Sequence, residues 1–125
     1  SGSTDATVSI ASRYPVKILS ITPEEFSFGR ALNIGCRAAT GDIIVIASAH
    51  VYPLYFDWLE NLLTPFERPE VALVYGQQRG NEITKYSEHQ VFAKWFPDIP
   101  DYNQTHPFCN NPNAAIRRLL WEKLP

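Results

Sequence analysis

Three short polar segments carry residue types that could do chemistry. The first is Ser1-Gly2-Ser3-Thr4-Asp5, which precedes a run suited to a short helix over residues 6–12. A polar turn at a helix N-terminus offers backbone N–H groups and hydroxyls that can bind a phosphate, a ribose or a base. The same residue types are preferred as helix caps. The turn alone therefore leaves a binding role and a capping role open for Ser3, Thr4 and Asp5.

The second segment is a helix predicted over residues 30–39, with Gly41 as its stop signal. Arg30 and Asn33 lie one helical turn apart and therefore share one face. A cation and an amide on one face could bind an anionic or polar ligand. A solvated helix surface is the alternative interpretation.

The third segment, Ser48-Ala49-His50, directly follows the unbroken β-branched run Ile43–Ile46, which is closed by Ala47. In open α/β sheets, ligands bind beyond the carboxyl ends of the strands. A histidine there could ligate a metal ion or donate a hydrogen bond to a phosphate, although many single histidines are structural.

The elements that must position these segments alternate along the chain. Short apolar runs predict strands over residues 16–19, 43–46, 71–75 and 113–117. Helix signals mark residues 6–12, 30–39, 57–63, 86–95 and 119–123. Residues 97–107 are rich in Pro, Asp and Asn and predict an ordered loop or a lid. Strand and helix in alternation predict an α/β fold with a mainly parallel sheet.

Length and composition exclude several classes of protein. A chain of 125 residues with 45% hydrophobic and 19% charged residues is one globular domain rather than a disordered segment. Its net charge of -2 argues against nucleic-acid binding. No apolar run reaches the roughly 18 residues that a membrane span needs. Two cysteines, Cys36 and Cys109, are too few for a disulfide scaffold and indicate reduced thiols in a cytoplasmic protein.

The order and spacing of these motifs resemble the nucleotide-sugar half of a family 2 glycosyltransferase with the GT-A fold, and most closely its rhamnosyltransferase-like subgroup. The resemblance runs through nearly the whole chain. The matching segments are the Ser1–Asp5 turn, the helix carrying Gly29 and Asn33 and ending in Ala39, Gly41 and Asp42, the Trp58–Leu62 helix, the Val71–Gly76 strand and the Asn111–Arg118 segment.

One departure from the family pattern affects the chemistry. The Asp-x-Asp motif, whose second aspartate holds a divalent ion in the family, aligns with Ser48-Ala49-His50. Imidazole is a competent ligand for Mn²⁺ and a poor one for Mg²⁺. Three interpretations stay open: Mn²⁺ bound by His50, metal-independent stabilisation of the leaving group by His50, and loss of activity.

The resemblance implies an enzyme that transfers a sugar, with inversion, from a nucleoside-diphosphate sugar to a saccharide or lipid-linked acceptor. The implied setting is bacterial cell-surface polysaccharide or lipopolysaccharide synthesis, in the cytoplasm or at the inner face of the membrane. It implies contacts to the nucleotide sugar from Ser3, Thr4, Asp5, Arg30, Asn33, Ser48, Ala49, His50, Asn111 and Asn113. The alternative is a non-catalytic nucleotide-sugar-binding or assembly module.

The resemblance also implies how the domain is divided. Residues 1–53 would form the nucleotide-sugar-binding half of a single partial GT-A domain, and residues 54–125 the half that faces the donor sugar and the acceptor. The family's first strand would precede Ser1 and its catalytic base would follow Pro125. We therefore expect the isolated segment to be inactive.

Overall fold

The computed structural model describes residues 2–123, which form two compact units that meet in the sequence between Asp42 and Ile43. This boundary is a property of the backbone contacts. The predicted functional halves, divided after residue 53, stay a prediction.

The first unit, residues 2–42, contains two helices, α1 (Thr7–Ala11) and α2 (Phe28–Ala38). Both were predicted from the sequence. Helix α2 begins where it does because the Ser27 hydroxyl accepts a hydrogen bond from the Arg30 amide at 3.2 Å, which satisfies one of the donors left free at a helix N-terminus.

The strand predicted over residues 16–19 is wrong, because the segment is in neither strand nor helix. Its apolar side chains are exposed, with Val16 at 56% and Ile18 at 43%. The Val16 amide donates locally to the Tyr14 carbonyl at 2.7 Å. A β-prone run forms a strand only where a neighbouring strand supplies its hydrogen bonds, and among the described residues this run has none.

The second unit, residues 43–123, contains the sheet. Its elements in chain order are β1 (Ile43–Ala47), α3 (Trp58–Leu63), the 3₁₀ helix η1 (Thr64–Glu67), β2 (Leu73–Tyr75), α4 (Tyr86–Trp95), β3 (Asn113–Arg117) and α5 (Arg118–Lys123). All but η1 were predicted, with ends that differ by no more than two residues.

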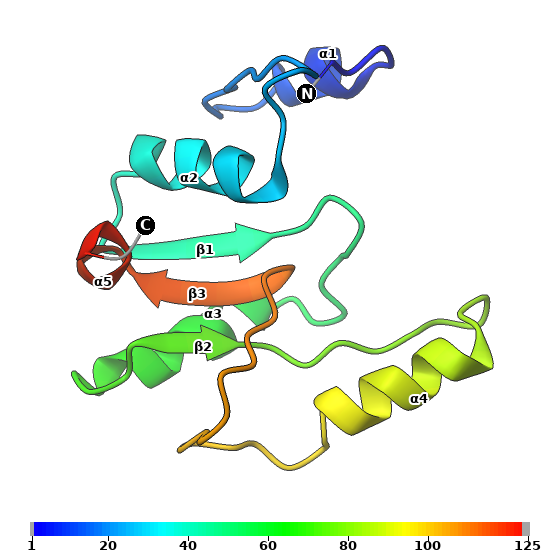
Figure 1. The fold of residues 1–125 in the computed structure, drawn as a ribbon, viewed down its shortest axis with the longest axis vertical. Helices are drawn as coiled ribbons and strands as arrows, with labels where there is room; N and C mark the ends of the chain where they lie inside the picture. Colours follow the sequence, from blue (N-terminus) through cyan, green and yellow to red (C-terminus); the bar gives the residue numbers. More distant parts are fainter. Residues whose placement is uncertain (1, 124–125) are drawn as a thin grey trace. The chain divides into compact units, whose positions relative to one another are not determined.

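The three strands form a sheet in the order β1-β3-β2, so the last strand lies between the first two (Figure 1). Strand β3 is antiparallel to both neighbours. The chain is therefore α/β, as predicted, but both pairings among residues 2–123 are antiparallel, and the mainly parallel sheet is not confirmed. Strands β1 and β2 do point the same way, and β3 enters between them from the opposite end.

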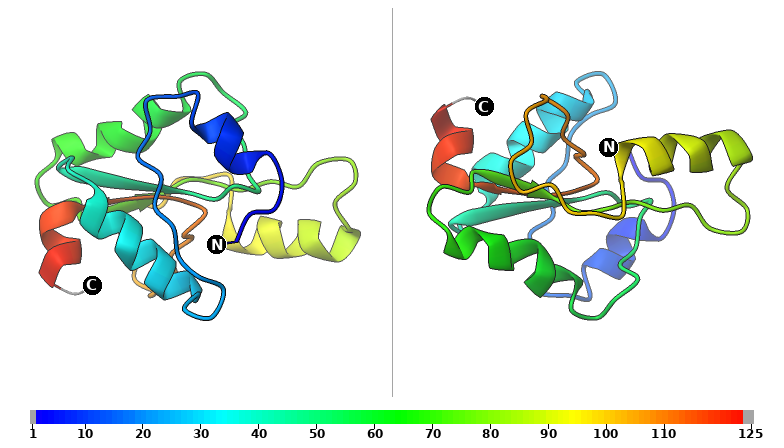
Figure 2. Two further views of the ribbon diagram at one scale, coloured as in Figure 1. Left: turned by 90° about the horizontal axis from the view of Figure 1, so that it is seen from above. Right: turned by 90° about the horizontal axis from the view of Figure 1, so that it is seen from below.

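The core of this unit lies where α3 and η1 pack on the sheet (Figure 2). Leu62, Phe66 and Ala115 are buried together at its centre. Leu62 and Leu63 of α3 face this core because apolar positions at helical spacing share one side of a helix, whereas Leu59 is exposed. Trp58, the first residue of α3, packs against this cluster and is half-buried.

Arg117, at the end of β3, connects the sheet by hydrogen bonds to η1 and to the chain between η1 and β2. Its guanidinium donates to the carbonyls of Val71 at 2.7 Å, Phe66 at 2.8 Å and Arg68 at 2.9 Å. The same group lies 5.2 Å from the centre of the Phe66 ring, within range of a cation–π interaction. The Arg117 guanidinium is thus bonded to main-chain carbonyls rather than solvated.

Candidate functional site

Strand pairing brings three segments to one edge of the sheet. The register pairs Ala47 at the end of β1 with Asn113 at the start of β3, and Tyr75 at the end of β2 with Ala114. Beyond the strands, the Ser48 amide donates to the Pro112 carbonyl at 3.0 Å and the Gly76 amide donates to the Asn113 carbonyl at 2.9 Å. Ser48 and Gly76 therefore lie on the two sides of the start of β3, where Asn113 is, at the carboxyl ends of β1 and β2.

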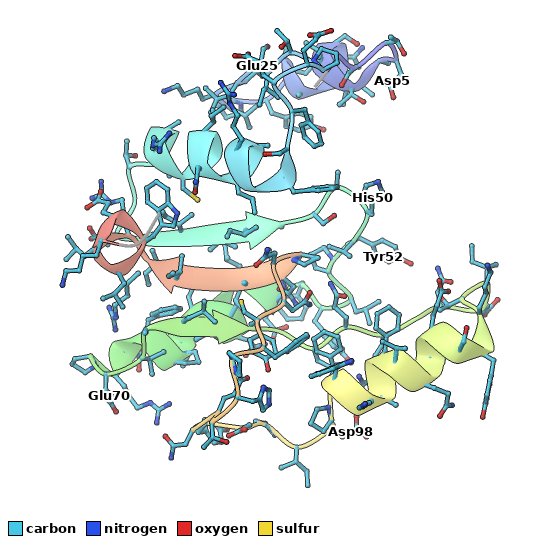
Figure 3. The ribbon with its side chains drawn as sticks, viewed as in Figure 1. Asp5, Glu25, His50, Tyr52, Glu70 and Asp98 are labelled. Atoms are coloured by element: carbon cyan, nitrogen blue, oxygen red, sulfur yellow. The ribbon has the colours of Figure 1, made fainter. Side chains whose placement is uncertain are left out.

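The Ser48-Ala49-His50 segment is a turn held by the Ser48 side chain. The Ser48 hydroxyl accepts from the His50 amide at 3.2 Å and lies 3.4 Å from His50 Nδ1. The Val51 amide closes the turn on the Ser48 carbonyl at 3.3 Å. Ala49 and His50 are exposed, and His50 is labelled in the loop that follows β1 in Figure 3. With Nδ1 beside the Ser48 hydroxyl, Nε2 is the imidazole nitrogen available to a ligand.

These groups do not fit a divalent ion held by the protein. The turn supplies one imidazole and one hydroxyl. Across residues 2–123, no group of three or more His, Cys, Asp and Glu side chains could hold a metal ion. The prediction of a Mn²⁺ ion on His50 thus finds no supporting ligands in this part of the chain, and we derive no chemical step through a metal.

Asn113 is fixed from two sides. Its side-chain oxygen accepts a hydrogen bond from the Trp58 indole N–H at 2.9 Å. Its amide nitrogen lies so close to Gly76 that a Cβ there would come within 2.2 Å of it. The sequence predicted Asn113 as a site residue but did not predict its bond to Trp58. No local signal could have found this bond, because it joins residues 55 positions apart.

Asn111 belongs to the turn that leads into β3, where its side chain is exposed. The adjacent Pro112 carbonyl accepts from Ser48. Asn111 thus lies at the same sheet edge as the 48–50 turn, as predicted, whereas a contact to a ligand stays a prediction.

Of the site residues predicted in the first unit, Asp5 and Arg30 have hydrogen-bonding partners close by in the sequence. The Asp5 carboxylate accepts from the Thr7 amide at 3.0 Å, and hydrogen bonds from Thr7 lower the Asp5 pKa. Asp5 thus bonds the first residue of α1 from the position before the N-cap, Ala6, whereas Ser3 and Thr4 are exposed. None of these three side chains caps α1, and a nucleoside contact stays a prediction.

Arg30 and Asn33 differ in their surroundings. The Arg30 guanidinium forms a salt bridge with Glu25 at 3.0 Å, and both side chains are about half exposed. Arg30 therefore braces the start of α2. Asn33 is half-buried, and none of the described hydrogen bonds involves its side chain.

The predicted loop at 97–107 is present and is anchored at both ends. Arg79 donates to the Phe96 carbonyl at 2.7 Å and forms a salt bridge with Asp98, labelled in Figure 3. Gln77 donates to the Pro97 carbonyl at 3.1 Å. The side-chain hydrogen bonds from Arg79 and then from Gln77 lower the Asp98 pKa. A carboxylate held in this way is poorly placed to act as a base.

Further along, aromatic packing anchors the loop. The Phe108 ring stacks on Trp95, with centroids 4.6 Å apart, and meets Tyr75 edge-on at 5.6 Å. The Tyr75 hydroxyl is hydrogen-bonded to Gln104. Burial, followed by the nearby Cys109 and Asp101, raises the Tyr75 pKa. The loop is therefore packed on the end of β2 in this structure.

Comparison with known proteins identifies the family. Residues 1–124 match the family model described as glycosyl transferase family 2, and the chain belongs to that family. It is 30% identical over 134 residues to the O-antigen chain rhamnosyltransferase WbaN of Salmonella anatum. It is 27% identical over 136 residues to the O-antigen chain rhamnosyltransferase RfbN of Salmonella typhimurium strain LT2.

Each of these two alignments covers 99% of this chain. The chain spans 42% of the length of WbaN and 43% of the length of RfbN. No solved structure matches it significantly. Within residues 2–123, no helix has both the length and the apolar character that crossing a membrane requires.

Proposed function

We propose that the protein containing this chain transfers a sugar from a nucleoside-diphosphate sugar to a saccharide or lipid-linked acceptor in the assembly of a bacterial surface polysaccharide. The observation that carries the proposal is the meeting of the 48–50 turn and Asn113 at the carboxyl edge of the sheet. Ligands of open α/β sheets bind at such edges. The family, and relatives that are named as O-antigen rhamnosyltransferases, support the reaction class.

In the proposed reaction, an acceptor hydroxyl attacks the anomeric carbon while the bond to the diphosphate oxygen breaks, so that the configuration inverts. The negative charge that develops on the leaving diphosphate needs hydrogen-bond donors. His50 Nε2 faces away from the Ser48 hydroxyl and would donate a hydrogen bond to the leaving diphosphate. We assign the catalytic base to none of the described residues.

The proposal does not depend on the other predicted contacts. Roles for Ser3, Thr4, Asp5, Arg30 and Asn33 at the nucleoside stay predictions, as does a cytoplasmic location at the inner face of the membrane. A divalent cation could still reach the site with the nucleotide, because the diphosphate itself offers oxygen ligands.

The experiment is a thermal-unfolding panel on the full-length protein with UDP, dTDP, GDP and their sugars, each with Mn²⁺ and with EDTA. A ligand that binds only the folded state raises the apparent stability by about 2.7 kcal/mol at a hundredfold excess over its dissociation constant. A shift with one nucleotide and its sugar, followed by sugar transfer to an acceptor, is the expected result. No shift with any of them would overturn the proposal.

One observation favours a second candidate function. Neither Ser48 nor His50 provides the carboxylates of the family's Asp-x-Asp motif, and among residues 2–123 no group of three or more His, Cys, Asp and Glu side chains could hold a metal ion. A non-catalytic module that binds a nucleotide sugar would need neither. Binding without any transfer or donor hydrolysis in the same panel would favour this alternative.

A further inference from the structure

We propose that Trp58 is a positioning residue of this site. Its indole N–H holds the Asn113 amide in one orientation, so that Asn113 Nδ2 donates a hydrogen bond to an oxygen of the donor sugar. The proposal rests on the proposed function, because it assumes that a nucleotide sugar binds at this edge of the sheet.

The orientation follows from the chemistry of the two groups. An indole N–H is a donor only, whereas a side-chain amide has one acceptor end and one donor end. The distance of 2.9 Å between Trp58 Nε1 and Asn113 Oδ1 is that of a good hydrogen bond. The opposite amide orientation would place two donors against each other. Trp58 therefore selects the orientation in which Nδ2 is directed away from the indole.

Gly76 provides the space that this orientation needs. A Cβ at position 76 would lie 2.2 Å from Asn113 Nδ2 and 2.9 Å from its Cγ, both far inside van der Waals contact. The backbone bond from the Gly76 amide to the Asn113 carbonyl keeps the two residues together. Any side chain at position 76 would therefore displace the Asn113 amide.

The amide nitrogen is left available to a ligand. None of the hydrogen bonds described for residues 2–123 uses Asn113 Nδ2. It is also not one of the atoms in that range that are both buried and unpaired. An amide donor with solvent access and a fixed direction can bind a ligand oxygen without first losing the entropy of alternative orientations.

The position of Asn113 favours the sugar rather than the diphosphate as its partner. The proposed diphosphate contact is His50, in the turn that follows β1. Asn113 belongs to the neighbouring strand, and adjacent strands lie about 4.8 Å apart. A group bonded to the diphosphate can reach across that spacing. A neutral amide suits the hydroxyl and ring oxygens of a sugar.

Trp58 is itself held in place by the core. Its ring packs against the cluster of Leu62, Phe66 and Ala115. Replacing Trp58 by Phe keeps an aromatic ring for this packing and removes the N–H. Trp95→Phe is the matched control, because the Trp95 ring stacks on Phe108 and its indole N–H makes none of the hydrogen bonds described for residues 2–123.

The test uses the full-length protein and isothermal titration with UDP, dTDP and GDP, each compared with its sugar. For the nucleotide that the wild type binds, Trp58→Phe should weaken the sugar nucleotide about threefold to tenfold, the value of one neutral hydrogen bond. Affinity for the nucleoside diphosphate alone should stay unchanged, and Trp95→Phe should change neither affinity.

A second variant keeps the proposal testable if Trp58→Phe folds poorly. Asn113→Asp retains an oxygen that can accept from Trp58 and replaces the donor nitrogen. It should lower affinity for the sugar nucleotide more than affinity for the diphosphate. Equal losses for both ligands, or none, in a folded variant would overturn the inference while leaving the proposed function intact. A wild type that binds no nucleotide sugar would overturn both.

Discussion

The hydrogen bonds of Arg117 allow a quantitative test of how the sheet is fixed. Arg117→Met keeps most of the aliphatic stem and removes the guanidinium. The Phe66, Arg68 and Val71 carbonyls then lose a charged donor. Because these carbonyls belong to η1 and to the chain that links it to β2, loss of their donor should loosen both against β3.

The size of the effect follows from how exposed each bond is. The bonds to Val71 and Phe66 are half-buried, whereas the bond to Arg68 is exposed. Bonds to charged groups contribute about 1.5–3 kcal/mol when well buried, and water can replace part of that at a half-exposed site. Two bonds at about 1–2 kcal/mol each, with little from the third, predict a loss of about 2–4 kcal/mol.

The assay is urea-induced unfolding of the full-length protein, followed by circular dichroism. The control is Arg30→Met, where the guanidinium forms a 3.0 Å ion pair with Glu25 and both side chains are about half exposed. Pairs of that kind contribute about 0–1 kcal/mol. An Arg117→Met variant that loses no more free energy of unfolding than Arg30→Met would refute the reasoning, because the three carbonyls would then be equally well satisfied by water.

Three further predictions follow from individual contacts. Because the folded-state pKa of Asp98 is lowered, its contribution to stability is present above the ordinary aspartate pKa near 4 and is lost as the pH falls through the lower folded value. Asp98→Asn should flatten stability against pH in that acidic range, and an unchanged slope would contradict this. Burial raises the pKa of Cys36 and of Cys109, so both thiols should be alkylated more slowly at pH 8 in the native protein than in urea. Equal rates would contradict their burial. Ser27→Ala should cost about 1 kcal/mol of stability, measured by urea unfolding, because the α2 cap is lost. A loss below about 0.3 kcal/mol would mean that water caps the helix as well as the hydroxyl does.

The sequence predicted elements better than it predicted their pairing. The ends of α4 and β3 were located correctly because apolar spacing and turn residues are local signals. The antiparallel pairing of β3 with both neighbours was not predicted, because the alternation of strands and helices says nothing about which strands become neighbours. Strand β3 comes last in the chain and lies between β1 and β2, an outcome decided by contacts across about 40 to 70 residues.

The same limit applies to the site. The 48–50 turn could be found because it follows the strongest apolar run, and Asn113 could be found by family resemblance. The partners that hold them are distant in sequence: Trp58 for Asn113, Pro112 for Ser48, and Gln77 for the loop at Pro97. The sequence could therefore nominate the residues that would meet a ligand, whereas the residues that orient them needed the fold.

Residues that orient the predicted ligand-binding groups offer a way for a family 2 chain without the Asp-x-Asp carboxylates to bind a nucleotide sugar. At Ser48 and His50 the usual anionic ligands are replaced by groups that can donate hydrogen bonds, and in the proposed function these would bind a diphosphate directly rather than through a cation. Hydrogen-bond donors stabilise a bound negative charge most when their direction is fixed before the ligand binds. The Ser48 hydroxyl does this for His50, and the Trp58 indole does it for Asn113. Nucleotide-sugar affinity that persists in EDTA and falls when either orienting group is removed would establish this mode of binding.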